Sequence, residues 1–415
     1  MNAGQIISIL IVRIHTLRDG LAIGEIGMNW KMTFGAAAAA AAMLANAHAA
    51  EPLKIGLILP MSGPFATYGS EISDGVQLWL KEHGGMVGGR KVQIVLRNDA
   101  PGTSGDVDKR LAQSLIVKDK VDLLAGFALT PSAFAVAPLA TEAKVPMVIM
   151  NAATSSVTTK SPYIVRVSMT LPQSAKVIAD WAAKNGVHKA FVLAADYAPG
   201  FDAAAQFKKS FTADGGSIVG DVKAPLSNPD YSPYLQRIKA AKPDAVFLFL
   251  PPGAGTIALM KGFVDQGLRA SGIRLIGTGD LTDEAILDSL GKPAIGVVTA
   301  FHYSEVHDSA QNKAFVSAFR KNWPTLRPDF MAVGGYDGMQ LIDLALAKTH
   351  GNASGPAFMS AVKGLHWMSP RGPVTIDPAT RDIEQDEYLR KVEMVDGQLQ
   401  NVEFATVPNV KDPGK

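Results

Sequence analysis

The sequence predicts an α/β protein built on parallel sheets, and three observations support this fold class. Apolar runs of strand length alternate with amphipathic helical patterns from residue 54 to residue 363, which is typical of parallel strands connected by helices. The chain has 415 residues, 47% of them hydrophobic and 19% charged, a composition that suits a globular protein of about two domains. Its end carries successive strand patterns around Asp396-Gly397, a hairpin turn signal, so we expect a terminal antiparallel hairpin.

The first strand, loop and helix organise the rest of the chain. Lys54–Leu59 is a short apolar run, as in a strand covered on both faces. Pro60–Gly69 is rich in proline and glycine and is predicted as a loop. A helix is predicted from Ser70, because apolar residues recur on one of its faces. Those residues are Ile72, Val76, Trp79 and Leu80. In an open parallel sheet such a loop lies at the carboxyl ends of the strands, where ligands bind.

The alternation continues in order along the chain. Strands are predicted at Lys91–Arg97, Val121–Gly126, Pro146–Met150, Tyr163–Val167, Ala190–Ala195, Ser217–Val222, Ala245–Leu250, Arg274–Gly277 and Gly296–Ala300. Helices are predicted at Asp106–Asp119, Ser132–Ala143, Pro172–Asn185, Phe201–Ala213, Ser232–Ala241, Ile257–Gln266, Asn312–Asn322, Ala332–Lys348 and Pro356–Lys363. The terminal strands are predicted at Pro373–Ile376, Glu387–Val395 and Leu399–Phe404.

Composition and motifs argue against several function classes. The net charge is +2 without a long basic run, so a nucleic-acid partner is not expected. The chain has no cysteine, which excludes disulfides, thiol catalysis and thiolate metal sites. Its 8 histidines lack metal-ligand spacing, and no H-E-x-x-H, G-x-S-x-G or P-loop motif is present. We therefore expect no catalytic residues, no metal and no cofactor, and interpret the chain as a protein that is not an enzyme.

The N-terminal region has the pattern of a secretory signal. Asn29–Ala49 combines a positive start at Lys31, an Ala-rich apolar run and the small-x-small site Ala47-His48-Ala49. We expect cleavage after Ala49, translation from Met28 or Met32, and a protein of the periplasm. An Ala-rich helix of the mature protein is the alternative interpretation.

The opening motif resembles that of the periplasmic substrate-binding proteins of branched-chain amino acid type ABC transporters (the type I, Leu/Ile/Val-binding family). Members open with a strand, a P-M-S/T-G-x-x-A-x-x-G loop and a helix with D/N-G. The matching residues here are Pro60-Met61-Ser62-Gly63, Ala66, Gly69 and Asp74-Gly75. The resemblance covers nearly the whole mature chain. It implies two Rossmann-like lobes with parallel sheets, joined by three hinge crossings.

The resemblance also implies that each lobe is discontinuous. We place the crossings near Val167, Ala300 and Ser369. Lobe one then comprises residues 50–168 and 300–368, and lobe two residues 169–299 and 369–415. Without the resemblance, the sequence equally permits two consecutive domains.

Loops after two predicted strands of lobe one provide candidate binding residues. Family members hold a ligand carboxylate there through backbone N–H groups and hydroxyls. By resemblance, the residues on this side are Phe127, Ala128, Thr130, Ala153 and Thr154. Neutral donors at helix starts bind an anion without burying an unpaired cation. Thr130 is equally suited to be a helix N-cap.

The second lobe provides an aromatic and an acidic candidate. Tyr197 resembles the ring that closes over the ligand in family members, although it also suits a packing role. Asp280 follows a predicted strand in the position where amino-acid binders place a partner for the α-ammonium group. The register leaves Gly279 as an alternative, and Asp280 also suits an N-cap before a helix at Thr282–Leu290. Tyr336-Asp337-Gly338 is a weaker candidate.

Two ligand classes compete. The family pattern suggests branched-chain amino acids, whereas four segments resemble the branch that binds aromatic carboxylates such as benzoate and hydroxybenzoates. The segments are Leu124–Phe127, Ala195–Gly200, Ala332–Gly338 and Ser369–Pro373. We favour the aromatic acid, with Phe127, Tyr68 and Tyr197 forming a flat slot and Asp280 accepting a ring hydroxyl.

The sequence thus predicts a monomeric transport receptor that closes two lobes around a small carboxylate and docks on a membrane permease. A ligand sensor of the same fold is the alternative. Thr154→Ala is expected to weaken carboxylate binding.

Overall fold

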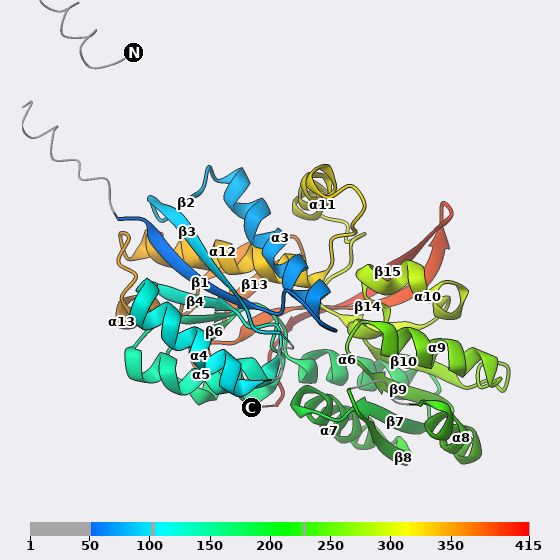
Figure 1. Cartoon of the computed structure of the whole chain (residues 1–415). Helices are drawn as coiled ribbons and strands as arrows, with labels where there is room; N and C mark the ends of the chain where they lie inside the picture. Colours follow the sequence, from blue (N-terminus) through cyan, green and yellow to red (C-terminus); the bar gives the residue numbers. More distant parts are fainter. Residues whose placement is uncertain (1–50, 101–103, 227–229, 415) are drawn as a thin grey trace, which may run out of the picture. The chain divides into compact units, whose positions relative to one another are not determined.

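Two sheets organise the described part of the computed structural model, which comprises residues 51–100, 104–226 and 230–414. The first sheet has six strands in the order β2-β3-β1-β4-β5-β6. The second has nine, in the order β12-β13-β14-β11-β10-β9-β7-β8, with β15 paired to β14 (Figure 1). We call the elements packed on the first sheet lobe one and those on the second sheet lobe two.

Lobe one is a parallel sheet with one short antiparallel edge strand. Its strands are β1 (Leu53–Leu59), β2 (Met86–Val87), β3 (Arg90–Asn98), β4 (Leu123–Gly126), β5 (Met147–Ile149) and β6 (Ile164–Arg166). β1 pairs in parallel with β3 and β4, β4 with β5, and β5 with β6, whereas β2 is antiparallel to β3. The loops after β4 and β5 therefore leave the same edge of the sheet.

Helices cover both faces of this sheet. They are α3 (Ala66–Glu82), α4 (Gly105–Ser114) with the π-helical turn η1 (Leu115–Asp119), α5 (Thr130–Ala143), the 3-10 helix η2 (Ser155–Lys160), α11 (Ala310–Asn322), α12 (Phe330–Lys348) and α13 (Gly355–Ala361). α3 lies along α12, whereas α4 and α5 lie together on the other side (Figure 1). A Cβ atom at Gly75 would come within 1.9 Å of the Ala332 carbonyl oxygen, so this glycine lets the two helices approach closely.

Lobe two has a parallel core extended by an antiparallel end. Its strands are β7 (Lys189–Ala195), β8 (Ser217–Ala224), β9 (Ala245–Phe249), β10 (Arg274–Thr278), β11 (Val298–Phe301), β12 (His366–Ser369), β13 (Gly372–Ile376), β14 (Ile383–Val395) and β15 (Gln398–Val410). Its helices are α6 (Leu171–Lys184), α7 (Ala198–Ala213), α8 (Ser232–Ala241), α9 (Ala254–Asp265), η3 (Gly279–Thr282), α10 (Glu284–Leu290) and η4 (Lys292–Ala294). β14 is antiparallel to β11 and β15 is antiparallel to β14, which confirms the predicted terminal hairpin.

The chain passes between the two sheets more than once. It leaves the first sheet after β6, returns to pack α11 and α12 against α3, and joins the second sheet again at β12. The predicted α/β fold with parallel sheets in two lobes is therefore confirmed. The limits of the lobes, and crossings near Val167, Ala300 and Ser369, stay predictions.

Several helices begin earlier than the sequence predicts, and close packing of glycine explains two of them. α3 begins at Ala66 instead of Ser70, and α7 at Ala198 instead of Phe201. A Cβ atom at Gly69 would lie 2.3 Å from the Pro60 carbonyl oxygen, and one at Gly200 would lie 1.9 Å from that of Ala195. Each glycine allows the first turn of its helix to pack against the preceding segment, so here glycine does not interrupt the helix.

The predicted signal segment and translation start lie outside the described residues. Within the described residues, the structure contains no helix with the length and apolar character needed to cross a membrane.

Candidate functional site

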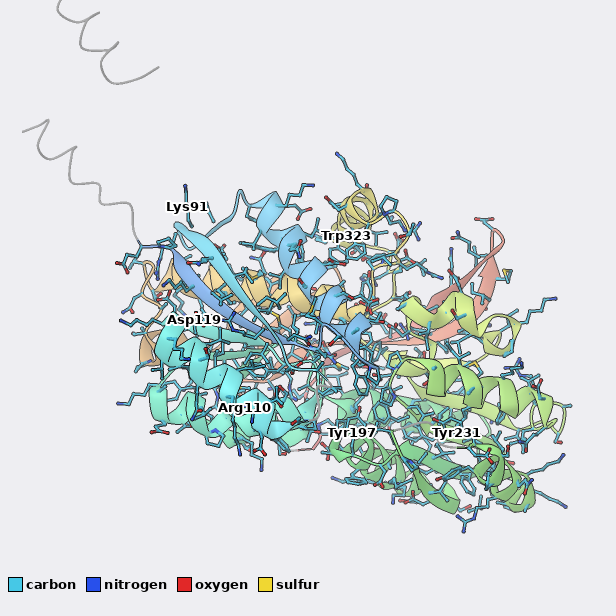
Figure 2. All side chains as sticks on the ribbon, in the orientation of Figure 1. Lys91, Arg110, Asp119, Tyr197, Tyr231 and Trp323 are labelled. Carbon is cyan, nitrogen blue, oxygen red and sulfur yellow. The ribbon has the colours of Figure 1, made fainter. Side chains whose placement is uncertain are left out.

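A cavity lies where loops of the two lobes meet. Lobe one contributes the segment around Thr130, at the start of α5, and Ala153, after β5. Lobe two contributes Tyr197, at the start of α7 (Figure 2), and Asp280, after β10. The full lining is Tyr68, Ala128, Leu129, Thr130, Asn151, Ala153, Met169, Leu171, Tyr197, Pro199, Phe249, Pro251, Pro252, Asp280, Phe330 and Met331.

The lobe-one wall is neutral and hydroxyl-bearing. Leu129 occupies the N-cap position of α5, and no side chain caps this helix, which corrects the interpretation of Thr130 as its N-cap. The Thr130 hydroxyl instead donates to the Thr154 hydroxyl at 3.1 Å. A helix N-terminus without a side-chain cap is a favourable place for an anion.

Two of the predicted residues lie outside the cavity lining. The ring of Phe127 is fully buried in an apolar cluster with Ile58 and Leu124, so Phe127 is not a wall of the slot as expected. Its backbone has a φ of 63° and accepts a hydrogen bond from the Ala152 N–H at 2.9 Å. Thr154 is 4% exposed and reaches the cavity only through Thr130.

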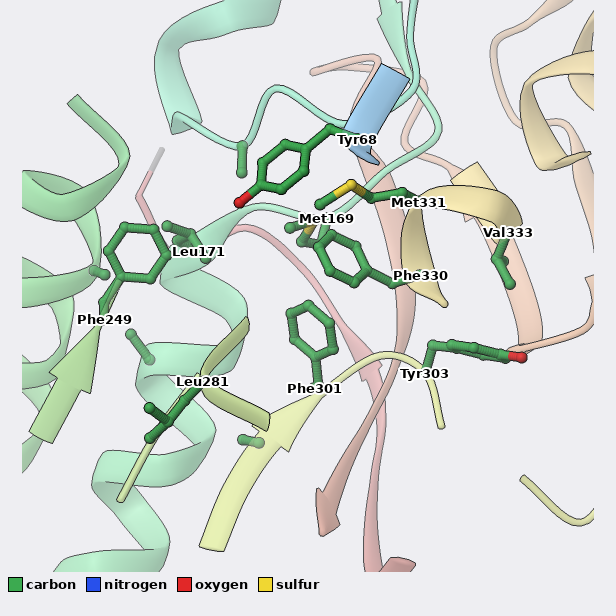
Figure 3. Packing of buried hydrophobic residues seen from close by; sticks show 14 of the residues in the cluster. Tyr68, Met169, Leu171, Phe249, Leu281, Phe301, Tyr303, Phe330, Met331 and Val333 are labelled. Atoms are coloured by element: carbon green, nitrogen blue, oxygen red, sulfur yellow. The ribbon is translucent and has the colours of Figure 1, made fainter. Parts of the chain in front are cut away.

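Aromatic rings from both lobes line the cavity. The Tyr197 and Phe249 rings stack with centroids 6.1 Å apart and planes at 18°. The Tyr68 hydroxyl donates to the Pro252 carbonyl oxygen at 2.8 Å, which joins α3 of lobe one to a loop of lobe two. Figure 3 shows the Tyr68, Phe249 and Phe330 rings in this region.

The lobe-two wall carries the single charged group among the described lining residues, Asp280. The Thr278 hydroxyl donates to Asp280 Oδ2 at 2.8 Å. Burial raises the pKa of Asp280 to about 6, although the Thr278 hydrogen bond opposes the rise. A Cβ atom at Gly279 would lie 2.1 Å from the Phe301 ring, so Gly279 faces the core and Asp280 is the one that lines the cavity. Asp283 caps α10 through the Ala285 N–H, which corrects the alternative that Asp280 is this cap.

The weaker candidate segment lies elsewhere. The Tyr336 hydroxyl donates to Glu82 at 2.8 Å, and Asp337 pairs with Arg371 at 3.1 Å.

Sequence reasoning did not assign several lining residues as ligand contacts. Asn151 lies two residues after the end of β5 and Phe249 ends β9, so position at a strand's carboxyl end was a usable signal for both. Met169, Leu171, Phe330 and Met331 gave no such signal, because they reach the cavity only through the way the lobes meet.

A family model described as "Periplasmic binding protein" matches residues 52–398. Together with the two-lobed fold and the interlobe cavity, this match defines a solute-binding protein of the ABC transporter class. The chain belongs to the periplasmic binding protein family. The expectation that it is not an enzyme is confirmed, because the family and its structural neighbours are binding proteins.

Among curated relatives, the "Leu/Ile/Val-binding protein homolog 6" of Brucella melitensis is 46% identical over 376 residues, which cover 90% of this chain and 96% of that protein. The "Leu/Ile/Val-binding protein BraC3" of Rhizobium johnstonii is 27% identical over 320 residues, covering 75% of this chain and 83% of that protein.

Solved structures give a second comparison. A solute-binding protein of an ABC transporter from Rhodopseudomonas palustris BisB5, in complex with 3,4-dihydroxy benzoic acid, is 55% identical with a TM-score of 0.84, and the match covers 88% of this chain and 99% of that one. One from Rhodopseudomonas palustris HaA2, in complex with p-hydroxybenzoic acid, is 45% identical with a TM-score of 0.85 over the same shares. A leucine-binding protein from Thermotoga maritima, 22% identical with a TM-score of 0.75 over 86% of this chain and 99% of that one, shares the fold.

Proposed function

We propose that the cavity captures a hydroxylated aromatic carboxylate, which the protein delivers to the permease of an ABC importer. The observation that carries this proposal is the set of groups that lines the cavity. Neutral donors come from lobe one, a single carboxylate comes from lobe two, and aromatic rings come from both lobes. The structures that are 44–55% identical and hold hydroxybenzoates support the same ligand class.

The ligand carboxylate would bind at the start of α5. Backbone N–H groups near Ala128 and Ala153 and the Thr130 hydroxyl are the donors on this side. When Thr130 turns its hydrogen to the anion, the Thr154 hydroxyl donates to Thr130 in its place. No lysine, arginine or histidine is among the described lining residues, so the empty cavity holds no buried cation that would need a partner.

Asp280 would accept the ring hydroxyl at the other end. Hydrogen bonds to an ionised acceptor are the strong ones, and a hydroxyl donor compensates for burial of this carboxylate. An unsubstituted benzoate leaves Asp280 without that donor. This asymmetry favours hydroxybenzoates over benzoate.

Closure of the lobes completes the site. Besides the Tyr68–Pro252 contact, the Ser155 N–H of lobe one donates to Asp202 of α7 at 2.8 Å. The ligand shifts an open–closed equilibrium through contacts that it makes with both lobes only in the closed form. We further propose that the protein acts as a monomer in the periplasm after removal of its signal segment.

A second candidate is a branched-chain amino acid, which the names of the curated relatives favour. Asp280 would then pair with the α-ammonium group. A ligand sensor with the same site is a third possibility, and a permease that accepts ligand from the closed protein distinguishes transport from sensing.

The test is calorimetry and thermal shift with benzoate, 4-hydroxybenzoate, 3,4-dihydroxybenzoate and leucine. We expect the hydroxybenzoates to bind tightest and to raise the melting temperature most. Asp280→Ala should weaken 4-hydroxybenzoate binding by ~10-fold or more, because a charged hydrogen bond is lost, with little effect on benzoate. Asp288→Ala, a change at an aspartate that is 73% exposed on α10, is the matched control. If leucine stabilises the protein and the aromatic acids do not, the ligand is an amino acid and the proposal of an aromatic acid is wrong.

A further inference from the structure

Three buried carboxylates act on one another near the cavity, and we call them the acid triad: Glu71, Asp283 and Asp329. Glu71 lies on α3 and Asp329 caps α12, both in lobe one, whereas Asp283 caps α10 in lobe two. Their exposed fractions are 4%, 1% and 0% for Glu71, Asp283 and Asp329 respectively.

The triad lies next to the cavity in sequence and in space. Tyr68 precedes Glu71 by one helical turn of α3, Asp280 is three residues before Asp283, and Phe330 follows Asp329. All three of these neighbours line the cavity. A change in the triad therefore acts on the walls that hold the ligand.

Each triad member has one carboxylate oxygen without a partner among the described residues. Asp329 Oδ1 accepts the Met331 and Ala332 N–H groups at 3.0 and 2.9 Å, and Asp283 Oδ1 accepts the Ala285 N–H at 3.0 Å. The unpartnered oxygens are Glu71 Oε2, Asp283 Oδ2 and Asp329 Oδ2. Buried charge without a partner is costly, so such groups neutralise instead.

The Glu71 and Asp329 carboxyl groups act on each other, and each has a buried oxygen that no N–H or hydroxyl group of the described residues reaches. Burial and the nearby like charge together favour a proton on one of the two groups. The closed arrangement therefore contains a site for at least one proton. The partners of this site come from both lobes, since Asp283 also acts on Glu71.

The titratable groups around the triad are mostly acidic and do not balance its negative charge. The further acidic groups acting on it are Asp74, Asp280 and Glu284. The Tyr68 and Tyr303 phenols also face it. Arg327 and Arg390 act on the neighbouring Glu284. Arg327 contacts Glu305 and Asp288 directly, at 2.8 and 2.9 Å.

We propose that closure of the lobes takes up protons at the acid triad, so that the closed form and its ligand affinity are favoured as the pH falls. This proposal rests on the proposed capture function of the cavity, and it concerns the regulation of that site.

The direction of this pH dependence follows from comparing the pKa values of the triad in the closed and the open forms. In the closed form burial, followed by the charge of Asp329, raises the pKa of Glu71 and of Asp283 well above the ordinary range. Opening separates Asp283 from the lobe-one pair and admits water, so these pKa values fall toward about 4. When the pH lies between the open-form and the closed-form pKa values, the ligand affinity falls roughly tenfold per unit rise in pH for each proton that closure takes up.

The experiment is titration calorimetry with 4-hydroxybenzoate between pH 5.5 and 8.0, in buffers of different ionisation enthalpy. The ligand's carboxyl and phenol titrate near about 4 and about 10, outside this window. We expect proton uptake on binding and an affinity that falls at least tenfold across the window. The double variant Glu71→Gln/Asp283→Asn should lose both effects. Glu82→Gln, at an exposed position of the same helix, should keep them.

Several results would overturn the proposal. Binding without proton uptake is one, and an unchanged pH slope in the double variant is another, because the slope would then belong to groups outside the triad. Failure of aromatic acids to bind at any pH would overturn the proposed function instead. Small-angle scattering of the ligand-free protein keeps the two failures apart. The proposal requires a smaller radius of gyration at pH 5.5 than at pH 8.0 in the wild type, and equal radii in the double variant.

Discussion

The cavity and the hinge differ in buried charge: the cavity lining is almost free of it, whereas the hinge contains it as ion pairs. The described lining of the cavity contains one charged residue, Asp280. Around the segments that link the two sheets, three arginine–carboxylate pairs are almost fully buried, and we call these pairs and their surroundings the hinge. They are Arg166–Asp382 at 2.6 Å, Arg371–Asp337 at 3.1 Å and Arg390–Glu284 at 3.6 Å. A permanent contact suits paired charge, whereas a site that alternates between empty and filled suits neutral donors.

The hinge arginines also connect segments that are distant in sequence. Arg371 donates through Nη2 to the Val167 carbonyl oxygen, and Arg390 donates through Nη1 to that of Tyr303. Val167 follows the last strand of lobe one and Tyr303 follows β11 of lobe two. The guanidinium groups therefore tie together segments that leave the two sheets, and the proposed closure would rotate the lobes about these contacts.

The largest effect is expected from breaking a hinge pair. Asp337 accepts hydrogen bonds from Trp367 Nε1 at 3.0 Å and from the Ser369 hydroxyl at 2.8 Å, besides its contact with Arg371. Asp337→Ala leaves a buried guanidinium without its carboxylate, so we expect the free energy of unfolding to fall by roughly 3–5 kcal/mol. Urea denaturation measures this change.

The control for this prediction is an exposed pair. Lys313 and Asp308 are 71% and 87% exposed, and Asp308→Ala should leave the denaturation midpoint unchanged because solvent screens such pairs. Equal effects of the two substitutions would remove the distinction between hinge and surface charge.

A second hinge prediction concerns pH. Glu387 of β14 is fully buried, and burial raises its pKa to about 8 against the opposing hydrogen bond from Ser174. Because the folded pKa exceeds the unfolded value of about 4.3, its contribution to stability is complete at low pH and is lost as the pH rises through 8.

Glu387→Gln should therefore match the wild type in melting temperature at pH 5 and exceed it by a few degrees at pH 9, about 1 kcal/mol or more. Differential scanning calorimetry at both values tests this. A variant that is less stable at pH 9 would show that the ionised form is the one that the hinge stabilises.

Most of the fold was predictable because the spacing of apolar residues along the sequence indicates which positions are buried. The strands from β1 to β11 and the hairpin after them follow apolar runs in the sequence, apart from the two-residue β2. The helix starts were predicted less well. Gly69 was assigned to the predicted loop and Gly200 lay just before the predicted helix Phe201–Ala213, whereas close approach to a carbonyl group requires glycine at both positions.

The sequence predicted those residues of the site that follow the end of a strand, and few others. Ala128, Thr130, Ala153, Tyr197 and Asp280 follow strands and line the cavity together with Tyr68. Phe127 also follows a strand, but its φ of 63° turns the ring into the core. Backbone conformation at one residue decides this, and the pattern of residue types does not encode it.

On the cavity side, the neutral donors provide the next prediction. Thr130→Val keeps the shape of the side chain and removes the hydroxyl, so we expect carboxylate affinity to fall by about tenfold. Thr154→Ala should have a smaller effect, about threefold, since its hydroxyl only orients that of Thr130. Calorimetry with 4-hydroxybenzoate measures both. An unchanged affinity for Thr154→Ala would remove that residue from the site, and a larger effect than for Thr130→Val would reverse their roles.

A smaller effect than that of Thr130→Val is expected where the cavity meets the contact between the two lobes. Tyr68→Phe removes the hydrogen bond to Pro252 but keeps the ring in the cavity wall. Because that bond joins the two lobes and would break in the proposed opening, its loss should weaken binding by about 1 kcal/mol and appear mainly as faster ligand release, measured by stopped-flow fluorescence. Tyr336→Phe is the matched control, since its hydrogen bond to Glu82 lies within lobe one. Faster ligand release in both variants would mean that the Tyr68–Pro252 hydrogen bond is not what keeps the lobes closed. Faster release in Tyr68→Phe alone would show that a neutral contact holds the cavity shut, while buried ion pairs hold the hinge.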